Sequence, residues 1–194
     1  MNAMDFSRRK FLVGAGTTAG GLTLGVSFGA DDALAKTGKT PEVNAWVVVN
    51  ADDSIVVRIG RQEMGQGTIT GLSQLVAEEL EADWAKVTYE YPTPGQNVAR
   101  KRVWGDFATS GSRGVRKSEK MMREGGAAAR MMLLQAAANQ WKVPVAEVSV
   151  AKGVITHKGS NRSTTYGKVA DAASKLTPPT NPPLKDPKTW TIAG

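Results

Sequence analysis

One stretch of the sequence, residues 60–80, joins a strand pattern to a helix pattern through a loop rich in glycine. The β-branched run Ile55–Ile59 predicts a strand, and over Thr70–Glu81 the apolar side chains recur at helical spacing. Gly65 and Gly67 allow positive φ angles and lack a Cβ atom, so backbone N–H groups can converge on an anion at the helix N-terminus. The stretch therefore predicts a strand, an anion-binding loop and a helix in succession.

The spacing of this loop does not identify its ligand. The loop lacks the Gly-Lys-Ser/Thr ending of a nucleotide phosphate loop and the GxGxxG order of a dinucleotide fingerprint. Phosphate, pyrophosphate and an anionic cofactor are all compatible with it. An ordinary structural loop without a ligand is the alternative, and it stays open at this point.

The N-terminal residues 1–35 have the pattern of an export signal. Arg8 and Arg9 form a twin-arginine motif, an apolar stretch follows, and residues 33–35 (Ala-Leu-Ala) form a small-residue cleavage site. A membrane anchor is the alternative, but the many glycines and threonines make a poor span. We therefore predict a removable twin-arginine signal peptide and a protein in the periplasm or at the periplasmic face of the inner membrane.

Composition limits the classes of function that remain. The chain has no cysteine, which excludes disulfides, thiolate metal ligands and an iron–sulfur cluster held by this chain. The formal net charge of +7 suits a polyanionic ligand. Export, together with the absence of an aromatic-interleaved basic strand, argues against nucleic acid.

Side chains that commonly carry catalysis are few. The one histidine, His157, lies beside Lys158-Gly159 and is expected to be an ordinary surface residue in a turn. Glu63 stands alone in the glycine loop, where a carboxylate more often caps a helix or pairs with an arginine than acts as a base. We predict neither a catalytic residue nor a metal ligand in this chain.

The rest of the pattern predicts an α+β fold: a small mixed sheet with one long and two shorter helices. Gly125 and Gly126 in the middle of the long helix predict a tight contact or a kink. Residues 96–110 are expected to be irregular. The predicted strands are Ala45–Val49, Ile55–Ile59, Val87–Tyr91, Val148–Val150 and Val154–Thr156, and the predicted helices are Thr70–Glu81, Val115–Trp141 and Tyr166–Leu176.

A second loop, residues 109–114, is rich in glycine and serine and leads into the predicted long helix. Two such loops with positive charge around them suit a ligand that carries phosphate or pyrophosphate. A solvated basic helix end is the equal alternative. The basic residues near this loop are Arg100, Lys101, Arg102, Arg113, Arg116 and Lys117, with Asp106 of opposite sign between them.

The ordered set of segments resembles the molybdopterin-binding large subunit of the xanthine dehydrogenase and aldehyde oxidase family, in particular the isoquinoline 1-oxidoreductase β-subunit type. The resemblance covers essentially the whole chain after the leader. The segments that carry it are Glu63–Gly67 with Thr70, Val76–Leu80, Thr109–Ser112, Ala127–Arg130, Ala136–Ala138 with Trp141, Tyr166-Gly167 and Leu184–Pro187.

The resemblance implies a molybdenum hydroxylase, which inserts a water-derived oxygen into an N-heterocycle or an aldehyde. Its cofactor would be molybdenum-molybdopterin in the cytosine dinucleotide form. By resemblance the first loop contacts the pterin and the metal end, and the second holds the pyrophosphate or cytidine part. The residues so assigned are Gly65, Gln66, Gly67 and Thr70 in the first loop and Ser110, Gly111 and Ser112 in the second. Ser110 stands where the family usually has glycine.

The resemblance also implies partners: a [2Fe-2S] small subunit and a cytochrome c, with membrane association only through partners. The family's second glycine-rich cofactor segment and late glutamate base do not occur in this sequence, so we expect an N-terminal portion that is inactive alone. The apolar run Met131–Leu134, all around the long helix, fits a fragment with uncovered surface.

The expected organisation has three parts. Residues 1–35 are the signal peptide, residues 36–176 a segment of the molybdopterin-binding domain, and residues 177–194 a proline-rich linker to a missing C-terminal part. The alternative is a non-enzymatic exported domain that binds an anion or serves as a scaffold.

Overall fold

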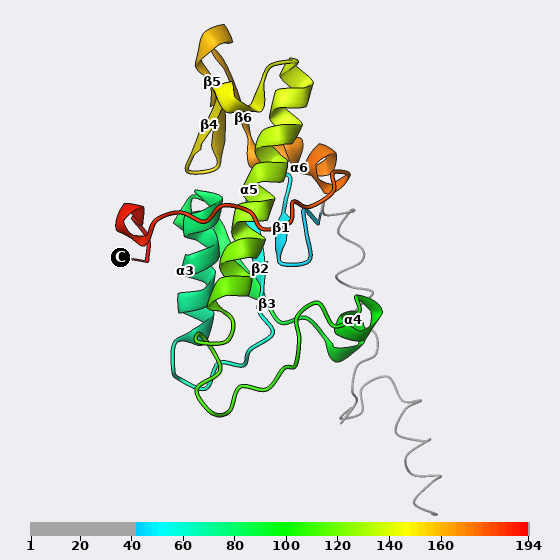
Figure 1. Ribbon diagram of the computed structural model, residues 1–194, viewed down its shortest axis with the longest axis vertical. Helices are drawn as coiled ribbons and strands as arrows, with labels where there is room; N and C mark the ends of the chain where they lie inside the picture. Colours follow the sequence, from blue (N-terminus) through cyan, green and yellow to red (C-terminus); the bar gives the residue numbers. More distant parts are fainter. Residues whose placement is uncertain (1–41, 194) are drawn as a thin grey trace, which may run out of the picture. The chain divides into compact units, whose positions relative to one another are not determined.

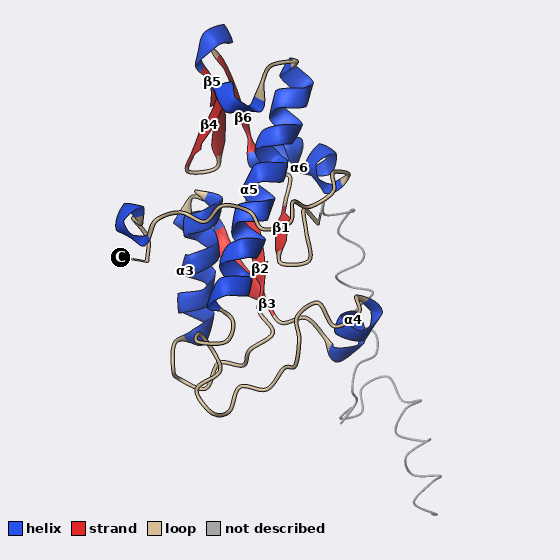
Figure 2. Ribbon diagram, viewed as in Figure 1, coloured by secondary structure: helices blue, strands red, loops and turns tan. Residues whose placement is uncertain are grey.

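The computed structural model of the chain describes residues 42–193, and the predicted signal peptide lies outside them. In this part of the chain two three-stranded sheets and four helices form, which confirms the α+β class (Figures 1 and 2). None of the helices within residues 42–193 is both long and apolar enough to cross a bilayer. The elements are β1 (Val47–Val49), β2 (Ile55–Arg58), α3 (Thr68–Leu80), β3 (Val87–Glu90), α4 (Pro94–Ala99), α5 (Glu119–Trp141), β4 (Val148–Ala151), β5 (Val154–His157), β6 (Arg162–Thr165) and α6 (Tyr166–Ser174).

The first sheet has the order β1-β2-β3. β1 and β2 pair antiparallel as a hairpin, with Val47 opposite Val57. β3 pairs parallel to β2, with Ile55 opposite Val87. Parallel neighbours need a crossover, which α3 supplies, so β2, the glycine loop, α3 and β3 form one strand–helix–strand unit.

Helices α3 and α5 lie side by side next to this sheet (Figure 1). Two glycines of α5 make the close approach possible. A Cβ atom at Gly126 would lie 2.8 Å from the carbonyl oxygen of Val76 on α3, and one at Gly125 would lie 2.8 Å from the ring of Trp46. The tight contact predicted from these glycines is therefore confirmed.

The apolar run of α5 is mostly covered by this chain itself. Leu133 is fully buried and Met132 is 2% exposed, because α3 packs on one side of α5 and α6 on the other. Met131 remains 37% exposed. The expectation of an uncovered run is therefore met by Met131 and is wrong for Met132 and Leu133.

Two elements differ from the sequence-based prediction. Helix α4 (Pro94–Ala99) overlaps the start of residues 96–110, which were expected to be irregular. Thr93 and Gln96 form a capping box around its first turn, and Pro94 occupies a first-turn position where proline is favourable. Strand β6 was not predicted, because its sequence Arg-Ser-Thr-Thr lacks apolar alternation.

The prediction of a surface histidine is wrong. His157 ends β5 and is 5% exposed, packed against the ring of Trp141. Its Nδ1 shares a 2.7 Å hydrogen bond with Ser160 Oγ, and its Nε2 shares one of 2.9 Å with Glu147 Oε2. This cluster joins the helical turn before β4 to the turn after β5, within the second sheet (order β4-β5-β6).

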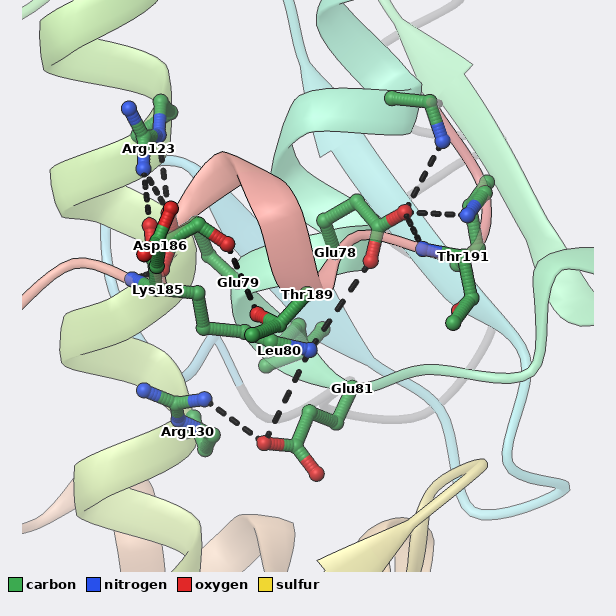
Figure 3. Close-up of polar contacts among 12 residues, drawn as sticks. Glu78, Glu79, Leu80, Glu81, Arg123, Arg130, Lys185, Asp186, Thr189 and Thr191 are labelled. Atoms are coloured by element: carbon green, nitrogen blue, oxygen red, sulfur yellow. Dashed lines mark hydrogen bonds and ion pairs between the residues drawn. The ribbon is translucent and has the colours of Figure 1, made fainter.

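The end of the chain, residues 184–193, is named here the C-terminal strap. It runs beside α3 and α5 (Figures 1 and 3). Two carboxylates near the end of α3, both almost fully buried, hold its backbone: Glu79 Oε2 accepts from the N–H of Lys185 at 3.0 Å, and Glu78 Oε1 accepts from Thr191 at 2.6 Å and from Ala193 at 2.9 Å. The linker role predicted for residues 177–194 stays a prediction, but the strap itself is packed.

Candidate functional site

The first glycine loop begins directly after β2 and ends where α3 begins, as predicted. The helix starts at Thr68, two residues before the predicted start. Gly67, the residue before the helix, has φ 76°, a conformation that side chains with a Cβ atom rarely adopt. The residue that joins the loop to α3 is therefore left-handed, which explains why glycine is needed at this position.

The second glycine loop, residues 109–114, precedes α5. Gly111 has φ 68° and Ser112 has φ 55°, so two consecutive residues are left-handed. The helix begins at Glu119, four residues after the predicted start, because residues 110–118 form turns instead. The loop thus stands apart from the helix rather than forming its first turn.

A buried arginine joins the two loops. Arg61, 6% exposed, lies three residues after the end of β2 and reaches across to the chain before the second loop. Its Nη1 donates to Asp106 Oδ1 at 2.6 Å and its Nε to Ser118 Oγ at 3.0 Å. This hydrogen bond to the guanidinium holds the pKa of Asp106 below its usual range. Because Arg61 binds residues on both sides of the second loop, it fixes the base of that loop against the first.

Two further contacts bring the loops together. The backbone N–H of Gln62 donates to Thr109 Oγ1 at 2.9 Å. Gly114 packs on Thr68 so closely that a Cβ atom there would lie 2.5 Å from Thr68 Oγ1. Both loops therefore lie at the same end of the α3–α5 pair, where each helix begins (Figure 1). This juxtaposition could not be read from the sequence.

All seven residues that the sequence assigned to cofactor binding are exposed at this end. Gly65, Gln66 and Gly67 lie in the first loop, Thr70 lies in the first turn of α3, and Ser110, Gly111 and Ser112 lie in the second loop. The structure thus leaves them accessible to a ligand, and their role in binding stays a prediction.

The anion cradle of the first loop contains a carboxylate of the chain itself. Glu63 Oε1 accepts from the N–H groups of Gly65 at 2.7 Å and Gly67 at 2.9 Å, and its Oε2 accepts from Ile69 at 3.1 Å. The hydrogen bonds from Gly67, Ile69 and Gly65 lower the pKa of Glu63 and outweigh the opposing effect of partial burial. Glu63 therefore caps the N-terminus of α3 from outside the helix.

The side chain of Gln66 closes the same loop. Its Nε2 donates to the carbonyl oxygen of Gln62 at 2.9 Å and to Thr68 Oγ1 at 2.8 Å, while its Oε1 accepts from the N–H of Met64 at 2.5 Å. Both amide hydrogens are thus used inside the loop, and the oxygen retains one lone pair. A ligand that needs a donor from Gln66 has to replace an internal bond.

The predicted basic cluster is only partly available to a ligand. Arg100 is paired with Glu42 at 2.6 Å, away from the second loop. Arg113 approaches Asp106 at 3.4 Å, and Arg116 donates to the carbonyl oxygen of Gly111 at 3.3 Å. Arg113 and Arg116 are therefore the basic side chains that the structure ties to the second loop.

Sequence reasoning missed the residues that support these loops. Arg61 was passed over although a buried arginine next to a glycine loop needs a partner, which Asp106 provides. Tyr91, at the end of the β3 segment, accepts a hydrogen bond at 3.2 Å from the N–H of Glu63. Only the position of Glu63, two and four residues before glycines with left-handed φ, was a visible signal for its capping role.

Residues 2–192 match the family described as the molybdopterin cofactor-binding domain. The chain belongs to this family. The resemblance seen in the sequence is thereby confirmed, and a molybdopterin cofactor is the ligand class to test against the two loops.

Two curated relatives are similar to the chain. The isoquinoline 1-oxidoreductase subunit β of Brevundimonas diminuta is 39% identical over 171 residues, which are 84% of this chain and 21% of the relative. The membrane-bound aldehyde dehydrogenase [pyrroloquinoline-quinone] of Gluconacetobacter polyoxogenes is 32% identical over 165 residues, 82% of this chain and 20% of the relative. The chain spans about a fifth of the length of these relatives.

Solved structures show weaker likenesses. The reconstituted CO dehydrogenase from Oligotropha carboxidovorans aligns with a TM-score of 0.47 at 22% identity, over 71% of this chain and 17% of that one. The quinoline 2-oxidoreductase from Pseudomonas putida 86 aligns with a TM-score of 0.38 at 15% identity, over 65% of this chain and 15% of that one.

The residues of the second loop fit the anionic part of a molybdopterin cofactor. Ser110 and Ser112 present hydroxyl donors, and the guanidinium of Arg116 lies at the carbonyl of Gly111. The space beside Gly111 is open, since within the described residues a Cβ atom there would lie more than 4 Å from every heavy atom beyond its chain neighbours. In the first loop the N–H groups of Gly65 and Gly67 are already bonded, which leaves Gln66 as its adaptable polar group.

Proposed function

We propose that this chain is a cofactor-binding portion of an exported molybdenum hydroxylase that oxidises an N-heterocycle or an aldehyde with water-derived oxygen. The observation that carries the proposal is the pairing of the two glycine loops through Arg61, the Gln62–Thr109 bond and the Thr68–Gly114 contact. Family membership over residues 2–192 and 39% identity to an isoquinoline 1-oxidoreductase subunit support it.

The division of labour between the loops follows from their donors. Gln66 in the first loop contacts the pterin or the metal end, and the hydroxyls of Ser110 and Ser112 hold the pyrophosphate, helped by Arg116. When bound, the cofactor supplies the redox centre that activates water and accepts the substrate's electrons. The residues of this chain bind and orient that group, and the base for the reaction comes from another part of the subunit.

The remaining features of the proposal concern the assembly. The cofactor is the cytosine dinucleotide form, and electrons leave through a [2Fe-2S] small subunit to a cytochrome c. Residues 1–35 direct the folded protein through the twin-arginine route to the periplasm. Residues 177–194 lead on to the remainder of the subunit.

Co-expression tests the proposal. The chain is produced together with the remainder of a relative's β subunit, the complex is purified, and its molybdenum and its acid-released nucleotide are measured. We expect about one molybdenum and one CMP per complex. A folded complex that takes up no molybdenum would refute the proposal and favour a non-enzymatic scaffold.

A pair of charge reversals makes the test specific to the second loop. Arg116→Glu places a negative charge beside Gly111, and we expect it to lower the molybdenum and CMP content by roughly tenfold or more, since charge-assisted bonds to phosphate are worth about 1.5–3 kcal/mol each. Lys168→Glu, at an exposed position of α6, changes the net charge equally and serves as the matched control. Equal cofactor content in the two variants would contradict the assignment of Arg116.

A further inference from the structure

We propose that Glu63 is a positioning residue for the molybdenum cofactor. Its carboxylate takes the N–H groups of the first loop that would otherwise bind phosphate, so that this loop meets the cofactor through Gln66 and leaves the anionic part to the second loop. The inference rests on the proposed function and assigns to Glu63 a role that acts through the loop rather than by contact with the reacting atoms.

The geometry shows one side chain organising the whole loop. The two oxygens of Glu63 receive three backbone donors, spread over the loop and the first turn of α3, at 2.7, 2.9 and 3.1 Å. Two of the donors, Gly65 and Gly67, have φ angles of 92° and 76°. Without the carboxylate these N–H groups turn to water, and the left-handed conformation of the loop loses its main internal support.

An internal carboxylate also decides which ligand the cradle accepts. A phosphate entering the same N–H groups has to displace Glu63 and lie close to its negative charge, and two like charges at such a short distance repel each other. The dipole of α3 is likewise already complemented by Glu63. The first loop is therefore closed to phosphate, unlike the second loop with its hydroxyls and Arg116.

The position of Gln66 depends on the same carboxylate. Gln66 lies between Gly65 and Gly67, both of which are fixed by Glu63, and its own amide bonds reach only Gln62, Met64 and Thr68. A loop that loses the Glu63 bonds therefore also loses the fixed presentation of the Gln66 amide. Glu63 in turn is anchored through its backbone, because its N–H donates to Tyr91 Oη at 3.2 Å.

The first test measures backbone hydrogen exchange by NMR on the full chain without cofactor. We expect Glu63→Ala to speed exchange at the amides of Gly65, Gly67 and Ile69 by at least about tenfold, since hydrogen bonds to charged groups are lost. Glu124→Ala is the matched control, since it removes the same side chain from α5, where its partner is the exposed Lys120 at 3.8 Å. If Glu63→Ala does not fold, Glu63→Gln provides the test. The N–H of Ile69 then faces either an amide nitrogen or a neutral amide oxygen, which is a weaker acceptor, so its exchange should still be faster than in the wild type.

The second test uses the co-expressed complex and two readouts besides activity. We expect Glu63→Gln to lower the molybdenum content severalfold and to alter the electron paramagnetic resonance spectrum of the metal that is retained, normalised to that metal. A merely structural role would lower the content of folded complex without altering the spectrum per molybdenum. Glu124→Gln on α5 should leave both readouts unchanged.

The outcomes separate the two proposals. Unchanged exchange at Gly65, Gly67 and Ile69 in the Glu63 variants overturns the positioning of the loop. Faster exchange with unchanged molybdenum content and spectrum overturns the role toward the cofactor. A wild-type complex without molybdenum refutes the proposed function and, with it, the cofactor part of this inference, whereas the exchange data still decide whether Glu63 holds the loop.

Discussion

The substitution Glu79→Gln tests the polar cluster that fastens the C-terminal strap (Figure 3). Glu79 is fully buried in α3, and its Oε1 lies 2.8 Å from the guanidinium of Arg123, whose side chain is 11% exposed. Breaking a buried pair by removing one partner costs about 3–5 kcal/mol. In the variant Arg123 retains three partners: the carbonyl oxygen of Lys185 at 2.7 Å, the carboxylate of Glu119 at 3.8 Å and the ring of Trp190. We therefore expect the free energy of unfolding to fall by about 3 kcal/mol, at the low end of that range.

Urea unfolding followed by circular dichroism at pH 7 measures this loss. With an m value of about 1–3 kcal/mol per molar for a small protein, a loss of about 3 kcal/mol moves the midpoint down by roughly 1–3 M. The matched control is Glu124→Gln on the neighbouring α5, where the i,i+4 partner Lys120 lies 3.8 Å away and is mostly exposed. Exposed pairs of this kind contribute about 0.5 kcal/mol or less.

Hydrogen exchange then shows whether the strap is what the carboxylates hold. Glu79→Gln should speed exchange at the amide of Lys185, and Glu78→Gln should do so at Thr191 and Ala193, because each glutamate binds its own part of the strap. An unfolding midpoint for Glu79→Gln equal to that of Glu124→Gln would show that the buried pair contributes nothing net. Equal exchange in all variants would show that packing alone holds the strap.

Three further substitutions test the packing around α3. Gly126→Ala should destabilise the chain by about 1–3 kcal/mol in the same urea assay, because the new methyl group would lie 2.8 Å from the carbonyl oxygen of Val76. Gly71→Ala is the control: a methyl group has ordinary space there and should stabilise α3 by about 0.5–1 kcal/mol. A Gly126→Ala variant more stable than Gly71→Ala would contradict the close contact. Tyr166→Phe removes a buried hydroxyl that donates to the carbonyl of Leu80 and should cost about 1–3 kcal/mol. Burial, followed by the charge of Glu81, raises the pKa of Tyr166 in the folded chain. The stability of the wild type should therefore fall as pH rises above about 10, where the tyrosine of the unfolded chain ionises. A wild-type decline no steeper than that of Tyr166→Phe would refute this.

The elements that the sequence predicted well are those whose signals are local. The strand Ile55–Arg58, the glycine loop and α3 follow one another as expected, because β-branched runs, glycines and helical spacing each act within a few residues. The glycine pair of α5 likewise predicted a close helix contact, since only a missing Cβ allows it. Helix α4 was missed although Thr93, Pro94 and Gln96 carried a capping signature that sequence reasoning can recognise.

The elements that could not be predicted depend on pairings distant in the sequence. The parallel pairing of β2 with β3 leaves no mark on either strand. The burial of Glu78 and Glu79 follows from Arg123 and from the strap more than a hundred residues later, and the sequence around the two glutamates does not reveal these partners. His157 was missed for a different reason, because its partners Glu147 and Ser160 are near in the sequence but meet it only through the turns before β4 and after β5.

The candidate site shows both limits at once. Its two glycine loops were found from composition, yet their adjacency depends on Arg61 and Thr109, which lie 48 residues apart. The anion cradle was also inferred correctly as a set of convergent N–H groups, but the anion that fills it is Glu63, only two residues before the first glycine. A glycine loop at a helix N-terminus therefore predicts a bound anion, but it does not tell whether that anion is a ligand or a carboxylate of the chain itself. An acidic residue two to six positions before the convergent donors can satisfy them within the chain. Before the second loop, residues 109–114, the acidic residue Asp106 is instead held by Arg61 and Arg113, so this loop keeps its donors for an external phosphate.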